Sequence, residues 1–170
     1  MTRFSLRTIV TLSLLTALEI VLNRFLSINA WNIKIGFSFV PVVIGAMLYG
    51  PLGGAVVGAL GDFIGALLFP IGPYFPGFTL TAFLMGAVFG LLLKKVRTVS
   101  RVLAAVGINQ FILSLFLNTL WISLLYGSPY VPLLATRLVQ AVVLTVAQIV
   151  VILALVRVMP QLEKAAGVKG

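Results

Sequence analysis

The sequence has no cysteine, no histidine and only three carboxylate side chains among its 170 residues. Disulfides, thiol chemistry and the usual zinc or haem ligands are therefore excluded. No Ser–His or Cys–His pair can form, and Glu163 lies in the tail, so only Glu19 and Asp62 remain as a candidate acid and base. No Gly-x-x-x-x-Gly-Lys-Ser/Thr phosphate loop is present, so the chain cannot drive transport with ATP by itself. We expect neither an enzyme nor a metal or cofactor site.

Apolar residues dominate instead, since 61% of the chain is hydrophobic and 9% is charged, with a mean hydropathy of +1.21. Soluble domains do not have this composition. At about 20 residues per crossing, the length allows six helical spans and leaves no soluble domain. Residues 1–170 are therefore predicted to form a single all-α membrane domain, with spans near residues 6–26, 37–49, 52–69, 79–93, 102–126 and 133–156. The first span resembles a signal peptide but lacks an obvious cleavage site and contains Glu19 and Arg24, so we expect it to be retained.

The net charge of +9 could suggest nucleic acid as a partner, but the basic residues lie at the termini and in one short loop, as topology signals do. Segment 37–49 decides the topology, because it is short, holds Pro41 and could be re-entrant instead of crossing. Nine of the twelve basic residues share one side only if it crosses; these are Arg3, Arg7, Lys94, Lys95, Arg97, Arg101, Arg157, Lys164 and Lys169. We therefore predict six crossings, both termini in the cytoplasm and no nucleic-acid partner.

Polar side chains recur at helical spacing within two of the apolar spans. The two stripes are Gln110, Ser114, Asn118 and Trp121, at steps of four, four and three, and Arg137, Gln140 and Gln148, at offsets of three and eleven. A charge inside an apolar span costs about 2.5 to 3.5 kcal/mol on insertion scales, so Arg137 requires a partner or a function. Both stripes are expected to face inward.

Charges from several spans are predicted to lie at one depth. Counted from the outer ends at about 1.5 Å per residue, Arg24, Arg137, Asp62, Glu19 and Asn118 lie about 5 to 12 Å deep. We predict an outward-facing pocket that is closed by ordered outer loops and rimmed by aromatic side chains, Trp31 among them. The candidate ligand-binding residues are Arg24, Asp62, Tyr74, Phe78, Asn118, Trp121, Tyr126 and Arg137.

Each of these residues also has a purely structural interpretation. Arg137 could form an internal ion pair with Asp62 or Glu19, and Asp62 could pair with a neighbouring helix. Glu19 and Asn23, four residues apart, could cap each other, and Arg24 could extend its head group to the membrane surface. The aromatic residues could form an ordinary interfacial belt.

Small residues mark two helix faces on which another backbone can approach closely. Ser13 and Ala17 form a small-x-x-x-small pair in the first span, and Gly54, Gly58, Gly61 and Gly65 form a stripe in the third. We predict that Ser13, Ala17, Gly54 and Gly58 dock onto a membrane partner, and that enlarging Gly58 abolishes docking without affecting the pocket. The alternative is close packing inside the chain.

Four segments resemble the S components of energy-coupling factor (ECF) transporters, in particular the folate-specific ones. They are ALEIVLNRFLSI (17–28), KIGFSFVP (34–41), GDFIGALLFPIGPYFPGFTLTAFLMG (61–86) and LNTLWISLLYGSPYVPLLATRLVQ (117–140). The resemblance covers nearly the whole chain, and the last segment is the one that resembles the folate branch. It implies a six-helix protein of the bacterial cytoplasmic membrane that captures folate from outside and assembles with a membrane T component and two cytoplasmic ATPases.

The chemistry of folate fits the candidate residues. A carboxylate such as Asp62 could accept hydrogen bonds from the donor-rich pterin edge, while Arg137, with Arg24 or Lys34, could hold the two carboxylates of the glutamate tail. Aromatic side chains would sandwich the rings.

Three other functions remain open at this point. The chain could be an S component for another vitamin, since the pocket is defined only as outward, aromatic and cationic. It could be a proton-coupled carrier that uses Asp62 and Glu19. It could also be a membrane scaffold without a ligand, whose polar stripes serve packing alone.

Overall fold

The computed structural model describes residues 5–29 and 34–167. Trp31, Arg3 and Lys169, named above, lie outside the described residues. The described chain is almost entirely helical. Its elements are α1 (Leu6–Arg24), β1 (Ile28–Asn29), β2 (Lys34–Ile35), α2 (Phe39–Tyr49), α3 (Pro51–Leu68), α4 (Pro76–Leu93), α5 (Val99–Gly107), the π-helix η1 (Ile108–Leu117), α6 (Asn118–Tyr126) and α7 (Tyr130–Ala166).

Within the described ranges, five apolar helical segments are long enough to cross a membrane, which establishes an all-α membrane fold. One of them, Phe39–Leu68, contains both α2 and α3. Gly50 separates the two helices with a φ of 80°, a backbone conformation that favours glycine, and Pro51 starts α3 at the position where proline is best tolerated. With 11 residues, α2 covers about 16 Å, roughly half the hydrocarbon thickness. The count of six spans therefore depends on α2.

Several helix boundaries differ from the sequence prediction, and three of the differences have a clear physical reason. Helix α4 begins at Pro76 rather than near residue 79, since proline at the first helical position needs no hydrogen-bonded amide. The predicted span 102–126 starts at Val99 and is built from α5, η1 and α6 in succession. Helix α7 continues to Ala166, ten residues beyond the predicted end. Its last turns are polar, so they are helical without belonging to the apolar span that the sequence predicts.

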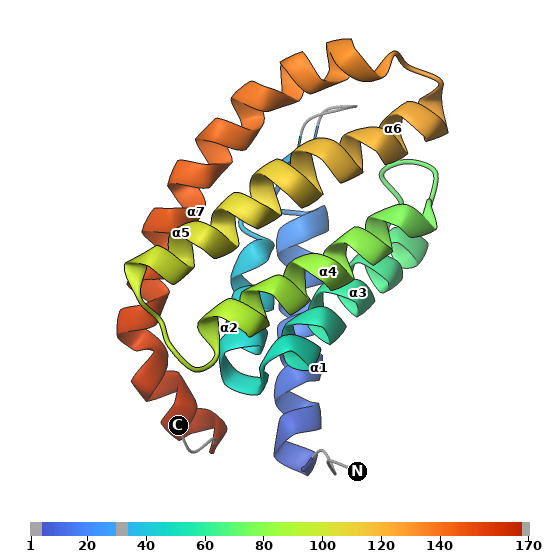
Figure 1. Cartoon of the computed structure of the whole chain (residues 1–170). Helices are drawn as coiled ribbons and strands as arrows, with labels where there is room; N and C mark the ends of the chain where they lie inside the picture. The colour runs from blue at the N-terminus through green and yellow to red at the C-terminus, as the bar shows by residue number, and fades with distance from the viewer. Residues whose placement is uncertain (1–4, 30–33, 168–170) are drawn as a thin grey trace.

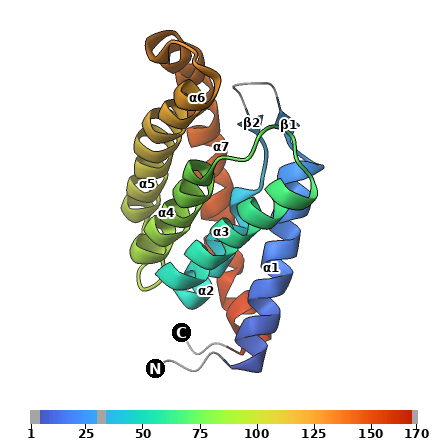
Figure 2. The same ribbon diagram turned by 90° about the vertical axis from the view of Figure 1, so that its right-hand side faces the viewer.

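The two ends of the bundle differ in character. The start of α1 and the end of α7 lie at one end, and the β1–β2 hairpin and the end of α6 lie at the other (Figures 1 and 2). The apolar core occupies the end with the termini; its fully buried members include Val43, Met47, Phe89, Val106 and Ile152. Dry packing at one end leaves the hairpin end for polar side chains.

The glycines in the first half of α3 pack against α4 of the same chain. A side chain at Gly54 would overlap the carbonyl oxygen of Gly86, and a Cβ at Gly58 would lie 2.6 Å from the carbonyl oxygen of Ala82. Both glycines are buried, whereas Ser13 and Ala17 on α1 are exposed. This corrects the expectation that Gly54 and Gly58 present a face to a partner, because they allow α3 and α4 to approach at backbone distance, as in the internal-packing alternative.

Candidate ligand-binding site

A cavity of about 350 Å³ lies between the helices towards the hairpin end, and its volume is within the range of small-molecule sites. Its walls come from α1, β2, α2, α3, the α3–α4 loop, α4, η1, α6 and α7. Segments distant in the sequence thus meet at one polar space. Seven of the eight predicted ligand-binding residues line it; these are Arg24, Asp62, Tyr74, Phe78, Asn118, Tyr126 and Arg137.

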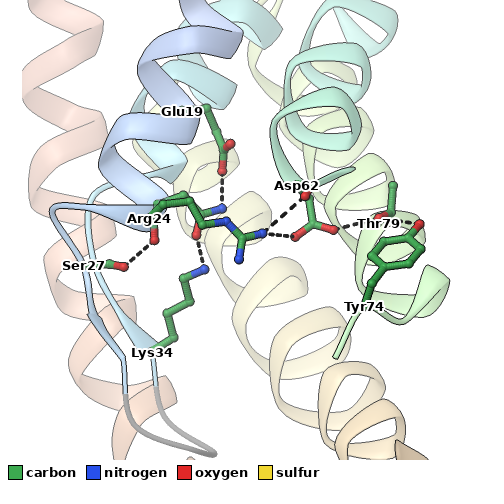
Figure 3. Close-up of polar contacts among 8 residues, drawn as sticks. Glu19, Arg24, Ser27, Lys34, Asp62, Tyr74 and Thr79 are labelled. Carbon is green, nitrogen blue, oxygen red and sulfur yellow. Dashed lines mark hydrogen bonds and ion pairs between the residues drawn. The ribbon is translucent and has the colours of Figure 1, made fainter. Parts of the chain in front are cut away.

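One wall is a chain of polar contacts from α1 across α3 to α4 (Figure 3). Arg24 places its Nη2 atom 3.8 Å from the carboxylate of Asp62 and donates to the Asp62 carbonyl oxygen at 3.3 Å. The other carboxylate oxygen of Asp62 accepts a hydrogen bond of 2.7 Å from Thr79, whose hydroxyl also meets that of Tyr74. Asp62 is therefore held on both of its oxygens, and Arg24 is tied to α3 rather than extended to the membrane surface.

The same wall continues through a second polar group. Asn23 donates to Oε1 of Glu19 at 2.6 Å, which is the mutual capping expected for this pair. Lys34 of β2 donates through Nζ to the side-chain oxygen of Asn23, and Gln140 of α7 donates to the Lys34 carbonyl oxygen at 2.6 Å. The hairpin is thereby fastened to both α1 and α7. The pKa of Lys34 is lowered to about 8, chiefly by burial and also by the neighbouring Arg24, while Glu19 and Asp62 partly offset the shift.

Arg137 belongs to the wall of the cavity that α7 contributes. Its side chain is buried, with 7% of the residue exposed, and Nη2 donates to the carbonyl oxygen of Ser114 at 3.3 Å. Asp62, one of the two carboxylates considered as its partner on sequence grounds, forms an ion pair with Arg24. The positive charge of Arg137 thus lies on the α7 wall of the cavity, against η1.

The π-helix η1 directs amides into the cavity. π-Helices are rare, usually last a single turn and occur often at functional sites, whereas η1 runs for ten residues. Gln110, Ser114 and Asn118 line the cavity from η1 and the start of α6, and Gln140 and Gln148 line it from α7. Within the described chain, the side-chain oxygens of Gln110, Asn118, Gln140 and Gln148 are buried without a hydrogen-bond donor. Buried acceptors of this kind are destabilising by about 1 to 3 kcal/mol each until a donor reaches them.

The aromatic residues divide into lining and supporting side chains. Tyr74, Phe78 and Tyr126 line the cavity, as does Phe75. Trp121 was predicted to bind ligand but is not part of the lining: its ring packs 5.6 Å from that of Phe75, and its indole N–H donates to Thr81 at 3.0 Å. Its helical phase was read correctly as inward, but its ring packs on Phe75, which lines the cavity, and supports that residue.

Several lining residues were not among the sequence candidates. Phe75, Gln110, Gln140 and Gln148 are of this kind. Glu19 and Lys34 also line the cavity; the sequence placed Glu19 at the depth of the pocket and offered Lys34 as an alternative to Arg24 for the glutamate tail. The glutamines were visible in the sequence, since Gln110 lies on the stripe of Asn118, and Gln140 and Gln148 lie on that of Arg137. Lys34 could be considered on its charge alone, because a loop has no helical phase that would point it at the site.

The chain was compared with known families and structures. A family model described as "ECF transporter, substrate-specific component" matches residues 7–160. The folate transporter FolT of Clostridium novyi (strain NT) is 42% identical over 154 residues, covering 89% of each chain. The folate transporter FolT of Leuconostoc mesenteroides is 34% identical over 126 residues, covering 73% of this chain and 68% of the relative.

The fold also matches a solved structure. A crystal structure of FolT bound with folic acid superimposes with a TM-score of 0.84 at 34% sequence identity, covering 89% of this chain and 93% of that one. The similarity therefore extends over nearly the whole of both chains.

Proposed function

This chain belongs to the substrate-specific components of ECF transporters, and from that premise we propose that it captures folate from outside the cell. Folate presents a flat pterin ring with a donor-rich edge, an aromatic linker and a glutamate tail with two carboxylates. The observation that carries the proposal is the cavity itself, which combines Arg137, aromatic side chains and buried acceptors that lack donors.

The two walls of the cavity differ in charge, and this difference gives the ligand a direction. The α1–α3 wall holds two cations, Arg24 and Lys34, and two carboxylates, Glu19 and Asp62, so its charges balance. The α7 wall carries the positive charge of Arg137. We place the neutral pterin ring against the balanced wall and the anionic tail at Arg137, which can bind a carboxylate through two parallel hydrogen bonds.

A thermal-shift measurement tests the substrate. A ligand that binds only the folded protein stabilises it by RT ln(1 + [L]/Kd), about 2.7 kcal/mol at a hundredfold excess over Kd. Folate is expected to raise the melting temperature of the purified chain, and riboflavin, thiamine and biotin at equal concentration are not. Stabilisation by one of these vitamins instead would assign the cavity to a different substrate. Folate uptake by the chain alone in liposomes under a pH gradient would favour a proton-coupled carrier.

The topology proposed is six crossings, with residues 1–170 as a single domain of the bacterial cytoplasmic membrane and both termini in the cytoplasm. The return of the chain to its starting end supports an even number of crossings, with α2 and α3 as a hairpin (Figure 2). The basic residues of the α4–α5 loop lie at the end with the termini, which fits retention of lysine and arginine on the cytoplasmic side.

Transport requires partners, because the chain has no phosphate loop of its own. We propose assembly with a membrane T component and two cytoplasmic ATPases, and Ser13 and Ala17 as the docking face. Both are exposed on α1 and line an apolar groove whose other side is Val56, Leu60 and Ile64 of α3. Small side chains here allow a partner helix to make close van der Waals contact, which drives helix association in lipid.

A further inference from the structure

The glycine stripe of α3 has two halves with different roles. Gly54 and Gly58 form the inner half, and Gly61 and Gly65 form the outer half, nearer the end of the helix. Gly61 and Gly65 do not face a helix backbone; they face charged side chains of α1. A side chain at Gly61 would overlap the carboxylate of Glu19, and a Cβ at Gly65 would lie 2.9 Å from Nε of Arg24. Each glycine therefore provides the space in which one charged group of the cavity wall rests.

Glu19 is a carboxylate of this wall that has one oxygen without a hydrogen-bond donor among the described residues. Its residue is 4% exposed, and it lines the cavity. Oε1 accepts from Asn23, while Oε2 is buried without a hydrogen-bond donor among the described residues. A buried carboxylate oxygen is strongly destabilising unless a donor reaches it.

Asp62, the carboxylate expected from the sequence to bind the ring, is differently placed. One of its oxygens accepts from Thr79, and the other faces the guanidinium of Arg24 (Figure 3). A ligand that used Asp62 would have to displace these contacts, whereas Glu19 can accept a new hydrogen bond without losing one.

We propose that Glu19, resting against Gly61, accepts hydrogen bonds from the 2-amino edge of the bound pterin ring, with Gly61 as its positioning residue. This inference rests on the proposed folate function. The ring edge supplies adjacent N–H donors, and a carboxylate oxygen held in a dry wall is the acceptor that discriminates best for them. Asn23 and, through it, Lys34 hold the other side of the Glu19 carboxylate.

Gly61 can act on binding without acting on the fold. The atoms that a Cβ at residue 61 would meet are Oε2, Cδ and Cγ of Glu19, the far end of a flexible side chain. Gly61→Ala therefore displaces the carboxylate and leaves the helix backbones in place. Gly54 is the contrasting case, since its nearest neighbours include the backbone of Gly86.

The direct test compares folic acid with its 2-deamino analogue on the purified full chain. The wild type is expected to prefer folic acid by about 10- to 100-fold, the worth of a hydrogen bond to a charged group. Glu19→Ala is expected to remove this preference while changing the affinity for the analogue by less than about threefold. Glu19→Gln, which keeps the size of the side chain, is the second variant and is expected to reduce the preference.

Two results would overturn the inference. Equal weakening of both ligands by Glu19→Ala would make Glu19 a structural residue, and an undiminished preference would assign the edge to another acceptor. Wild type that binds neither ligand would overturn the proposed folate function itself, and so the two failures are distinguishable.

The positioning role of Gly61 is tested in the same assay. Gly61→Ala is expected to weaken folic acid binding by about tenfold in the wild-type background and to add nothing to Glu19→Ala, because the group it displaces is then absent. Gly107→Ala is the matched control, since Gly107 is also helical and a Cβ there meets nothing within 4 Å. A loss of the same size in both backgrounds would show that Gly61 sets helix spacing and does not position Glu19.

Discussion

The charged residues around the cavity are individually held in place, and this fixes what each can do. Arg24 is occupied by Asp62, Lys34 is directed at Asn23, and Arg137 is held against the Ser114 carbonyl of η1. Of the three cations, Arg137 is the one that lies on the α7 wall, against η1. Residue-level changes should therefore have separable effects on binding.

Arg137→Ala is expected to weaken folate binding strongly. Removal of one partner of a desolvated charge pair typically costs about 2 to 5 kcal/mol, or roughly 30-fold to several thousandfold in affinity. Titration of the purified variant with folate measures the change. Arg157→Ala, at an exposed position near the end of α7, serves as the control and should bind normally. Near-native affinity in a folded Arg137→Ala protein would return Arg137 to a packing role.

Folate affinity is expected to fall as pH rises through about 8, the pKa to which burial lowers Lys34. Below this pH Lys34 is charged, and the cavity holds three cations against two carboxylates; above it the charges balance. Loss of one charge that acts on the ligand at an effective dielectric constant of about 20 is expected to cost about 1 kcal/mol, or about fivefold in affinity.

Lys34→Arg keeps its charge over this range and isolates the effect, since ionisation of folate itself is common to both proteins. The difference between the two pH titrations measures the contribution of Lys34. Identical profiles would show that the charge of Lys34 does not influence the ligand.

At the scale of helices, α3 is the element with the most distinct functions. Gly54 and Gly58 let α4 approach, and Gly61 and Gly65 accommodate Glu19 and Arg24. A further face of the helix, with Val56, Leu60 and Ile64, borders the exposed groove with α1. The π-helix η1 is the second specialised element, because it joins α5 to α6 without a break and presents Gln110 and Ser114 to the cavity.

Enlarging the two small-residue faces should have opposite consequences. Gly58→Leu is expected to weaken folate binding at least about tenfold, because Gly58 lines the cavity and a side chain there meets the Ala82 carbonyl; overpacking of this kind costs about 1 to 3 kcal/mol. Ala17→Leu is expected to leave folate binding intact and to abolish co-purification with the T component, because Ala17 is exposed in the groove.

Folate titration and co-purification, measured on the same preparations, separate the two activities. Leu14→Ala changes an exposed α1 residue outside the groove lining and should affect neither. Complex formation that survives Ala17→Leu would place the partner elsewhere, and normal folate binding by Gly58→Leu would show that α3 and α4 can separate without loss of the site.

The whole molecule combines a dry end with a polar end. Close packing of α2 against α3, α4 and α7, with α5 packed on α4 and α7, forms the core beside the termini, while the cavity lies towards the hairpin. An ion pair of 2.5 Å between Arg97 and Glu163 joins the α4–α5 loop to the last turns of α7 at the dry end.

The proposed topology places the α4–α5 segment in the cytoplasm, and a cysteine at Ser100 tests it in a chain that has no native cysteine. Ser100→Cys is expected to resist an impermeant thiol reagent added to intact cells and to react after the cells are opened. Pro70→Cys, exposed in the α3–α4 loop, is the control and should react from outside. Labelling of Ser100→Cys in intact cells would contradict six crossings with cytoplasmic termini.

The sequence alone determined the membrane class, the positions of most helices and the inward stripes. These follow from properties that each segment carries by itself, namely apolar length and the 3.6-residue period. The same period predicted that Arg137 and Asn118 lie at the cavity, and the proline-rich, aromatic loop before α4 predicted the same for Tyr74. Charge counting suggested a shared layer of polar groups, because an ionised side chain in an apolar span must face the protein interior.

Only the tertiary structure decided which neighbour each residue meets. Helical period cannot distinguish a glycine that faces a partner from one that faces α4, which is why Gly54 and Gly58 were misassigned. It cannot show that Trp121 packs against Phe75 and lies outside the cavity lining. Nor can it show that Asp62 is occupied by Arg24 and Thr79, while Oε2 of Glu19 has no hydrogen-bond donor among the described residues. These are distances between segments far apart in the chain, and they are fixed by how closely α1, α3 and α4 pack, a quantity that no single segment contains.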